Sequence, residues 1–383
     1  MDFDLNAEQQ QLADTVRRWA EKDYSFDTRK KIIHSASGVS DSSWQALAEL
    51  GVLALPVPEE QGGFNGSAID MMVVMQELGR ALMIEPVFAT ALGVQFLKLA
   101  GGHEALLERV AGGELKLACA LGEPQSRHDL HDIATTAVVS SSASGDGYRI
   151  NGTKSVVLHG AQAGYLIVSA RSAGAQRDTE GITLFAVPAD TAGIHCQDYR
   201  TNDGMRAATI TFKDVQVSSA ALLGKVGQGF TILDHAADYG VALLAAEAVG
   251  AMEALTMATV EYLKTRQQFG VPIGKFQALQ HRMAEMFMQL EQARSMAMLV
   301  AVKMATQDTQ ERRRTASAAK ARIGIAAKFI GQQAVQLHGG MGVTNELHAA
   351  HYFKRLSMIE LTLGDTDHHL ARFAAQPNFK QAA

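Results

Sequence analysis

The stretch Arg266-Gln267-Gln268-Phe269-Gly270 separates two long helical patterns and is followed closely by Pro272-Ile273 and by Phe276-Gln277-Ala278. A second distinctive stretch, Gln336-Leu337-His338-Gly339-Gly340-Met341-Gly342, begins seventy residues after Arg266. Arginine is a permanent planar cation that suits phosphate recognition, and paired glycines let a ligand approach the backbone closely. With the composition and patterning described below, these features indicate a soluble cofactor enzyme of helix–sheet–helix order.

Composition describes an ordinary globular protein. The chain has 383 residues, of which 47% are hydrophobic and 20% are charged, and its net charge is −5. It can therefore bury large cores, and we expect two or three domains. No long basic run suggests nucleic-acid binding, and no uninterrupted apolar run reaches membrane-spanning length. Cys119 and Cys196 lack metal or redox spacing, and the N-terminus is acidic and polar. We therefore expect a cytoplasmic protein without a metal site.

Three segments with different patterns divide the chain. Residues 1–115 show helical spacing, and Asn6 is a candidate N-cap for the first helix. Residues 116–225 alternate and are rich in β-branched residues, which predicts a middle antiparallel β-domain. Residues 226–383 return to long helical patterns, which predict a C-terminal bundle. The expected strands are 135–139, 148–150, 165–168, 182–187 and 209–212, and the expected bundle helices are 231–265, 277–306 and 315–337.

This order differs from the βαβ alternation of a Rossmann fold, and no G-x-G-x-x-G motif follows a strand. A nicotinamide site is therefore not indicated. Asp146-Gly147 and Asn151-Gly152 flank the strand around Tyr148 and are typical of tight turns. The fold class predicted is α+β multidomain.

These segments and motifs resemble those of the acyl-CoA dehydrogenase family over nearly the whole chain. The resemblance implies an N-terminal helical domain, a middle β-domain and a C-terminal four-helix bundle. It also implies that FAD lies between the β-domain and the bundle, where a neighbouring subunit closes the site. Besides the two stretches quoted above, it rests on residues 148–154, 203–204, 212–215, 223–224 and 227–230.

The resemblance assigns residues to the flavin site. Arg266 matches the arginine that reaches the flavin pyrophosphate from the neighbouring subunit. Gly339 and Gly340 match glycines that let a helix end approach the pyrophosphate, and Gln336 matches a contact to the adenylate half. Taken singly, Arg266 is equally well read as a surface ion-pair partner and the glycine pair as a helix cap. The other cofactor contacts implied are Leu121, Gly122, Arg127, His128, Val156, Leu158, Gln268, Phe269, Ile273, Gln277 and Thr366.

The middle segment departs from the family pattern in two places. The family favours T-E-P-x-x-G-S-D, whereas residues 122–129 carry Arg127 and His128 at the Gly-Ser positions. These two side chains either bind a phosphate or a substrate carboxylate, or point outward. The family's W-I-T-N is replaced by Val156-Val157-Leu158-His159. The tryptophan that packs on the flavin and the threonine that hydrogen-bonds its N5 edge are both absent.

The carboxylate that should remove the substrate α-proton is missing from both usual positions. The reaction requires a polarised thioester carbonyl and a carboxylate against the α-carbon while a β-hydride moves to flavin N5. Aligned from Arg355, the common glutamate position is Gly364 in this chain. The alternative position, early in the first bundle helix, corresponds to Gly240.

Three acidic residues remain near these positions. Glu247 lies seven residues after Gly240 on the same helix face, among apolar neighbours, and is either the base or half of a buried ion pair. Asp365 follows Gly364 and is either the base or a cap and hydrogen-bond partner of the histidines after it. Asp238 better resembles the family's aspartate that touches the CoA moiety. Asp238 and Gly240 are therefore assigned to substrate binding.

The most specific resemblance is to the small-subunit type of pimeloyl-CoA dehydrogenase. It rests on residues 154–160, 246–255, 351–356 and 364–369. It implies a partner chain of the same fold, so an α2β2 assembly stands beside a homotetramer. Arg127 then becomes a candidate contact for the distal carboxylate of a dicarboxylyl-CoA substrate.

Three functions remain open from the sequence. The first is FAD-dependent α,β-dehydrogenation of an acyl-CoA to the trans-2-enoyl-CoA in fatty acid, dicarboxylate or sterol degradation, with an electron-transfer flavoprotein as acceptor. The second is a catalytically degenerate subunit that completes the flavin site of a paralogous partner. The third is another flavin reaction, such as oxygen-dependent oxidation or nitroalkane chemistry, which peroxide release would reveal.

Overall fold

The computed structural model describes residues 5–142 and 145–377. Internal contacts divide the chain into two compact units. The sheet unit comprises Ile32–Ser67 and Ile84–Gly240, and the bundle unit comprises Met1–Lys31, Ala68–Met83 and Val241–Ala383. Both units draw on the N-terminal third of the chain. The predicted domains at residues 1–115, 116–225 and 226–383 were defined by sequence pattern and not by internal contacts, and that division stays a prediction.

The sheet unit is built on eight strands. These are β1 (Leu117–Ala120), β2 (Thr136–Ser142), β3 (Gly145–Leu158), β4 (Tyr165–Arg171), β5 (Ile182–Pro188), β6 (Ile194–Arg200), β7 (Arg206–Ser218) and β8 (Leu222–Leu223). The path through the sheet is β6-β7-β3-β2-β4-β5-β8, and β1 pairs with β4. Most pairs are antiparallel, as predicted, but β1 runs parallel to β4, and β2 pairs with β4 in parallel at Thr136 and Arg171. Its helices include α3 (Asp41–Glu49), α5 (Val87–Ala100) and α6 (Glu104–Ala111).

The turn signals around Tyr148 were misleading. Strand β3 runs through both Asp146-Gly147 and Asn151-Gly152 to Leu158. Its long antiparallel pairing with β7 overrides the local turn preference, and the ladder accommodates Gly152 by a register shift between Ile150 and Gly152. The two turn signals therefore predicted a strand that is too short at both ends, 148–150, where the structure has Gly145–Leu158.

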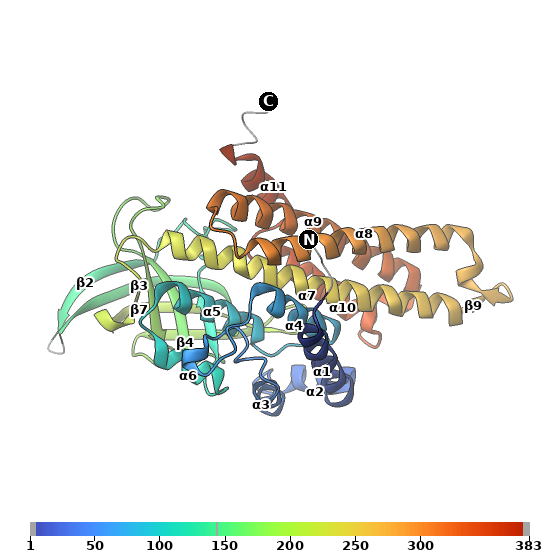
Figure 1. Ribbon diagram of the computed structural model, residues 1–383, viewed down its shortest axis with the longest axis horizontal. Helices are drawn as coiled ribbons and strands as arrows, with labels where there is room; N and C mark the ends of the chain where they lie inside the picture. Colours follow the sequence, from blue (N-terminus) through green and yellow to red (C-terminus); the bar gives the residue numbers. More distant parts are fainter. Residues whose placement is uncertain (1–4, 143–144, 378–383) are drawn as a thin grey trace. The chain divides into compact units, whose positions relative to one another are not determined.

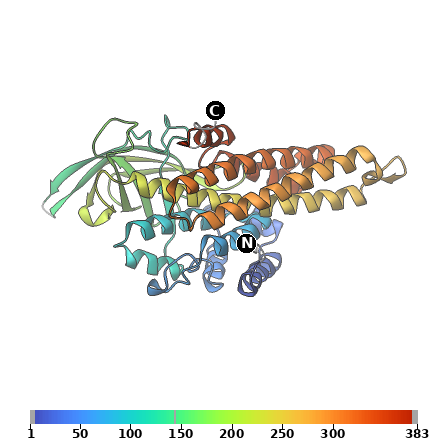
Figure 2. The same cartoon turned by 45° about the horizontal axis from the view of Figure 1, so that its top comes forward.

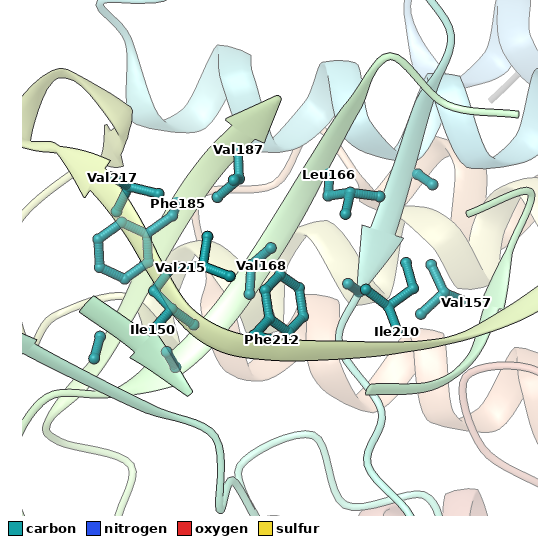
Figure 3. Packing of buried hydrophobic residues seen from close by; sticks show 14 of the residues in the cluster. Ile150, Val157, Leu166, Val168, Phe185, Val187, Ile210, Phe212, Val215 and Val217 are labelled. Atoms are coloured by element: carbon teal, nitrogen blue, oxygen red, sulfur yellow. The ribbon is translucent and has the colours of Figure 1, made fainter. Parts of the chain in front are cut away.

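The core of the sheet unit is apolar and fully buried. Alternate residues of the strands point to one face, as the two-residue period of a strand requires. Figure 3 shows Phe185 and Phe212 among the branched side chains that surround them. The labelled members are Ile150, Val157, Leu166, Val168, Phe185, Val187, Ile210, Phe212, Val215 and Val217. This packing fixes β3, whose end carries several predicted site residues.

The bundle unit is dominated by long helices. Its elements are α1 (Ala7–Asp23), α4 (Ala68–Arg80), α8 (Gln277–Lys303), α9 (Thr309–His338), α10 (His348–Leu361), α11 (Thr366–Ala374) and the parts of α2 (Phe26–His34) and α7 (Phe230–Thr265) that fall within it. Asn6 caps α1, as predicted, and the cap is a reciprocal capping box with Gln9. Helices α8 and α9 run side by side (Figures 1 and 2), and α9 also packs on α10 and α11.

Two glycines bring α4 and α7 into backbone contact. A Cβ at Gly79 would lie 2.0 Å from the carbonyl oxygen of Glu247, and one at Gly250 would lie 1.8 Å from that of Gln76. Helix α7 is long and apolar enough to cross a membrane by composition alone, yet 78% of its most apolar window is buried inside the protein. It is packed as the core helix of a bundle.

Candidate functional site

The predicted flavin-binding arm is a two-stranded hairpin between α7 and α8, at the tip of the bundle (Figure 1). Strands β9 (Gln267–Gln268) and β10 (Val271–Pro272) are joined by Phe269 and Gly270. Both turn residues have positive φ, 54° and 78°, as a type I′ turn requires. Phe269 is a poor residue for that conformation and is 91% exposed. The turn thus holds a large apolar side chain in solvent.

A cavity of about 660 Å³ lies beside this hairpin. It brings together six of the predicted cofactor contacts, whereas Phe269 and Gln277 do not line it. These six residues are Arg266, Gln268, Ile273, Gln336, Gly339 and Gly340. Two stretches seventy residues apart in the sequence therefore meet at one site. Arg282, Tyr262 and His338 also line the cavity and were not predicted.

The lining of this cavity suits a phosphorylated group. It contains two arginines, Arg266 and Arg282, and no carboxylate among its described residues. Within residues 5–142 and 145–377, the Arg266 guanidinium makes no hydrogen bond or ion pair. A Cβ added at Gly339 or Gly340 would meet nothing within 4 Å, so both backbones are open to a ligand. These features fit the pyrophosphate and adenylate half of FAD.

The helix end at this cavity is a C-terminus. Gly339 is the C-cap residue of α9, with φ 58°, and a short 3₁₀ helix (Gly339–Val343) follows. The negative end of the helix dipole lies at this end, which disfavours an anion. The glycines therefore provide access, and the attraction for a phosphate must come from side chains.

The loop of residues 122–129, where the family has T-E-P-x-x-G-S-D, is attached to β3 by a buried ion pair. Lys154 Nζ lies 2.7 Å from Glu123 Oε1, and both side chains are almost completely buried. Burial lowers the pKa of Lys154 to about 8. Burial alone would raise the pKa of Glu123, but the charge and hydrogen bond of Lys154, together with hydrogen bonds from Gln125 and Thr135, hold this pKa below its usual value. The Ser155 amide also donates to the Gly122 carbonyl.

This attachment places the predicted residues of the sheet unit around one strand end. Leu121 is buried, whereas Arg127 is exposed at the loop surface with φ 49°. Val156 occupies the irregular stretch of β3 between Lys154 and Val157, with φ 52° and 55% exposure. A β-branched residue in this conformation is strained. The remaining predicted contacts here, Gly122, His128 and Leu158, are partly buried.

Glu247 is held in a buried ion pair. The Arg355 Nε and Nη2 atoms donate to its two carboxylate oxygens at 2.5 and 2.8 Å. Glu247 is 4% exposed and Arg355 is 2% exposed. Both oxygens of Glu247 are therefore engaged with a permanent cation. Of the two roles that the sequence left open, the geometry matches the buried ion pair and speaks against the base.

Gly364, the common position of the family's glutamate, is a crowded position where any side chain would also be strained by the backbone conformation. Its φ is 108°, and an added Cβ would lie 2.6 Å from His369 Nε2 and 2.7 Å from a ring carbon of His368. His369 Nε2 lies 2.8 Å from the Leu363 carbonyl oxygen, and burial lowers the pKa of His369 to about 3. The buried Lys320 ammonium donates to the Gly364 carbonyl. The two histidine rings pack against Gly364, and hydrogen bonds from Lys320 and His369 hold the turn.

The other candidates near the missing base are also in structural roles. Asp365 is the N-cap of α11 and accepts a hydrogen bond from the His368 amide at 2.8 Å. The Thr366 amide donates to Glu360 Oε1 at 2.9 Å. Asp238 is 1% exposed, and Gly240 is buried as well. Across the described ranges, no three His, Cys, Asp or Glu residues form a group that could hold a metal.

Arg282 was not predicted because it lies four residues beyond Ala278, the last residue of the motif. On α8, Arg282 lies three residues after Leu279 and four after Ala278, so the three side chains share a helix face and together line the cavity. That spacing was readable in the sequence once the hairpin had been recognised.

Comparison with known proteins agrees with this architecture. Residues 6–111, 118–215 and 227–376 match the N-terminal, middle and C-terminal domains of acyl-CoA dehydrogenases, respectively. A probable acyl-CoA dehydrogenase, YngJ of Bacillus subtilis, is 30% identical over 379 residues, which are 96% of this chain and 97% of YngJ. Butyryl-CoA dehydrogenase from Megasphaera elsdenii is 25% identical with a TM-score of 0.88, covering 98% of this chain and 99% of that one. A variant of the Tcur3481–Tcur3483 steroid ACAD is 28% identical with a TM-score of 0.88, with the same coverage.

These matches span nearly the whole chain and confirm the predicted fold class. The chain therefore belongs to the acyl-CoA dehydrogenase family, as an FAD-dependent oxidoreductase of the type that acts on CH–CH bonds.

Proposed function

We propose that this chain is the half of a two-component acyl-CoA dehydrogenase that completes the flavin site of a paralogous partner. The partner would supply the catalytic carboxylate. The observation that carries this proposal is a contrast within the chain. The cavity that the family resemblance assigns to a neighbour's flavin is open and cationic, whereas Gly364 is crowded by two histidine rings and has a φ that a glutamate rarely adopts.

The reaction proposed for the assembly is α,β-dehydrogenation of an acyl-CoA to the trans-2-enoyl-CoA. FAD, when bound, accepts the β-hydride at flavin N5. In this chain, Arg266 and Gln268 would hold the pyrophosphate, and Gly339 and Gly340 would admit it. Phe269, exposed on its strained turn, would pack against the neighbouring chain. The partner's carboxylate would remove the α-proton.

The state of this chain's own acidic residues supports an external base. Glu247 is engaged on both oxygens by Arg355, and Asp365 caps a helix. The tryptophan and threonine positions of the family's W-I-T-N motif are Val156 and Leu158, with Val156 at a strained, exposed position of β3. The similarity to the steroid ACAD named for two components also supports a partner. A role like that of the small subunit of pimeloyl-CoA dehydrogenase, an α2β2 assembly, an electron-transfer flavoprotein as acceptor and a cytoplasmic location complete the proposal.

The test compares the purified chain with its complex. The chain is produced alone and together with a second family member that carries the glutamate. The flavin absorption spectrum of each is recorded before and after anaerobic addition of butyryl-, octanoyl- and pimeloyl-CoA. We expect acyl-CoA to bleach the flavin only in the complex. Stoichiometric FAD in the isolated chain, bleached by an acyl-CoA, would refute the need for a partner.

A second measurement asks whether the chain can be given its own base. Gly364→Glu is expected to remain inactive alone, because the new Cβ would lie 2.6 Å from His369 Nε2. Gly364→Glu with His369→Ala is the matched control that removes the contact with the His369 ring, while the contact with His368 and the positive φ of residue 364 remain. Turnover by the Gly364→Glu single variant would show that the turn tolerates a glutamate, against the geometry described above.

A further inference from the structure

We infer that Arg282 is a second cation for the pyrophosphate of FAD and acts beside Arg266 in the hairpin cavity. The inference rests on the proposed contribution of this cavity to a flavin site. Both guanidinium groups line the cavity, and no carboxylate lies among its described lining residues. An arginine forms strong, charge-assisted hydrogen bonds with phosphate oxygens.

Charge balance requires more than Arg266. The pyrophosphate of a dinucleotide carries two negative charges, and the C-terminus of α9 adds a negative helix end at Gly339. His338 does not compensate, because burial lowers its pKa and its Nδ1 donates to the Ala334 carbonyl at 2.8 Å. Arg282 is the remaining cation among the described lining residues. Together the two arginines match the charge of the pyrophosphate.

The Arg282 side chain is oriented by one hydrogen bond, which leaves most of its N–H donors unused. Its Nη1 donates to Gln333 Oε1 on the neighbouring helix α9 at 3.1 Å. In the part of the chain that the structure describes, this is the one hydrogen bond its side chain makes. A guanidinium has five N–H donors in a fixed fork, so four remain for a ligand. Gln333 therefore restrains the arginine while leaving its charge available.

The experiment measures binding directly. FAD, ADP and riboflavin are titrated into the full chain, in the assembly that binds FAD, by fluorescence and calorimetry. Arg282→Gln is compared with Arg282→Lys and with Arg294→Gln, which removes a cation from the same helix but outside the cavity. We expect Arg282→Gln to weaken FAD and ADP about tenfold, at the lower end for a charge-assisted hydrogen bond, and to reduce the dependence of their affinity on salt. Riboflavin, which has no phosphate, should bind with unchanged affinity.

The outcomes separate this inference from the proposed function. Recovery of FAD affinity in Arg282→Lys, with circular dichroism unchanged in all variants, would support a charge role. Equal FAD and ADP affinities in Arg282→Gln, Arg294→Gln and the wild type would overturn the inference and leave the proposed function standing. An equal loss of riboflavin affinity would overturn it as well, because the effect would then be structural. A wild-type chain that binds neither FAD nor ADP, alone or with its partner, would overturn the proposed function.

Discussion

Replacing Glu247 by glutamine is expected to destabilise the bundle unit rather than to stop a proton transfer. The carboxylate accepts two hydrogen bonds from the Arg355 guanidinium, and both residues are buried. Removing one charge of such a pair leaves the other uncompensated, which typically lowers the free energy of unfolding by about 3–5 kcal/mol. Because glutamine keeps one acceptor oxygen, we expect the free energy of unfolding to fall by about 3 kcal/mol, the lower end of this range.

The assay is urea unfolding followed by far-ultraviolet circular dichroism. Glu261→Gln is the matched control on the same helix, because Glu261 is 61% exposed in its pair with Lys264. An exposed pair contributes about 0.5 kcal/mol or less. Replacing both buried partners, as Glu247→Leu with Arg355→Met, should restore most of the stability, because no charge is then left buried. An unchanged urea midpoint in Glu247→Gln, together with complete loss of turnover, would refute this reasoning and make Glu247 the base.

Three further predictions concern the hairpin, the turn at Gly364 and the helix contact. Phe269→Asn should raise the free energy of unfolding by up to about 1 kcal/mol, because asparagine tolerates positive φ; sedimentation and FAD titration should show weaker assembly and binding, and unchanged values for both would contradict the role of Phe269. Burial lowers the pKa of His369 to about 3 from an unfolded value near 6.5, so its contribution to stability is complete above pH 6.5 and is lost as pH falls towards 3, at up to about 1.4 kcal/mol per pH unit. Urea midpoints of His369→Gln should therefore fall less steeply with acid than those of the wild type, and parallel curves would exclude this assignment. Gly250→Ala should lower stability by about 1–3 kcal/mol or more, because its Cβ would lie 1.8 Å from the Gln76 carbonyl oxygen, whereas Gly340→Ala, which meets nothing within 4 Å, should be neutral in the same unfolding assay.

Local signals in the sequence predicted local structure well where no distant partner competed. Asn6 and Gln9 form the capping box because both groups lie within one helical turn. Asn151-Gly152 carried an equally clear turn signal, yet β3 continues through it because pairing with β7 satisfies the backbone on both sides. The long helices and the strands β2, β3, β4, β5 and β7 followed from periodicity, whereas β1, β6, β8 and the order of the strands in the sheet did not.

In the candidate site too, some features could be predicted from the sequence, whereas others depend on residues far away in the chain. The sequence identified Arg266 and Gly339, and the structure places both at one cavity. It could not choose between the two roles of Glu247, because its partner Arg355 lies 108 residues away and several other cations compete as candidates. The crowding at Gly364 depends on where the ring of His369 packs, which no spacing rule gives.

The geometry at Gly364 also bears on how the chain lost the usual base position. Truncating a glutamate to glycine in an otherwise unchanged site would leave a space lined by its former neighbours. Here Nε2 of His369 lies 2.6 Å from the position that the Cβ would take and 2.8 Å from the Leu363 carbonyl oxygen, while the Lys320 ammonium donates to the Gly364 carbonyl. The site is therefore rebuilt around glycine and is not an empty version of an active one. The hairpin cavity has not been filled in this way, since its glycines face open space. One crowded half-site and one open half-site in the same chain support the proposal that a second chain provides the complementary half.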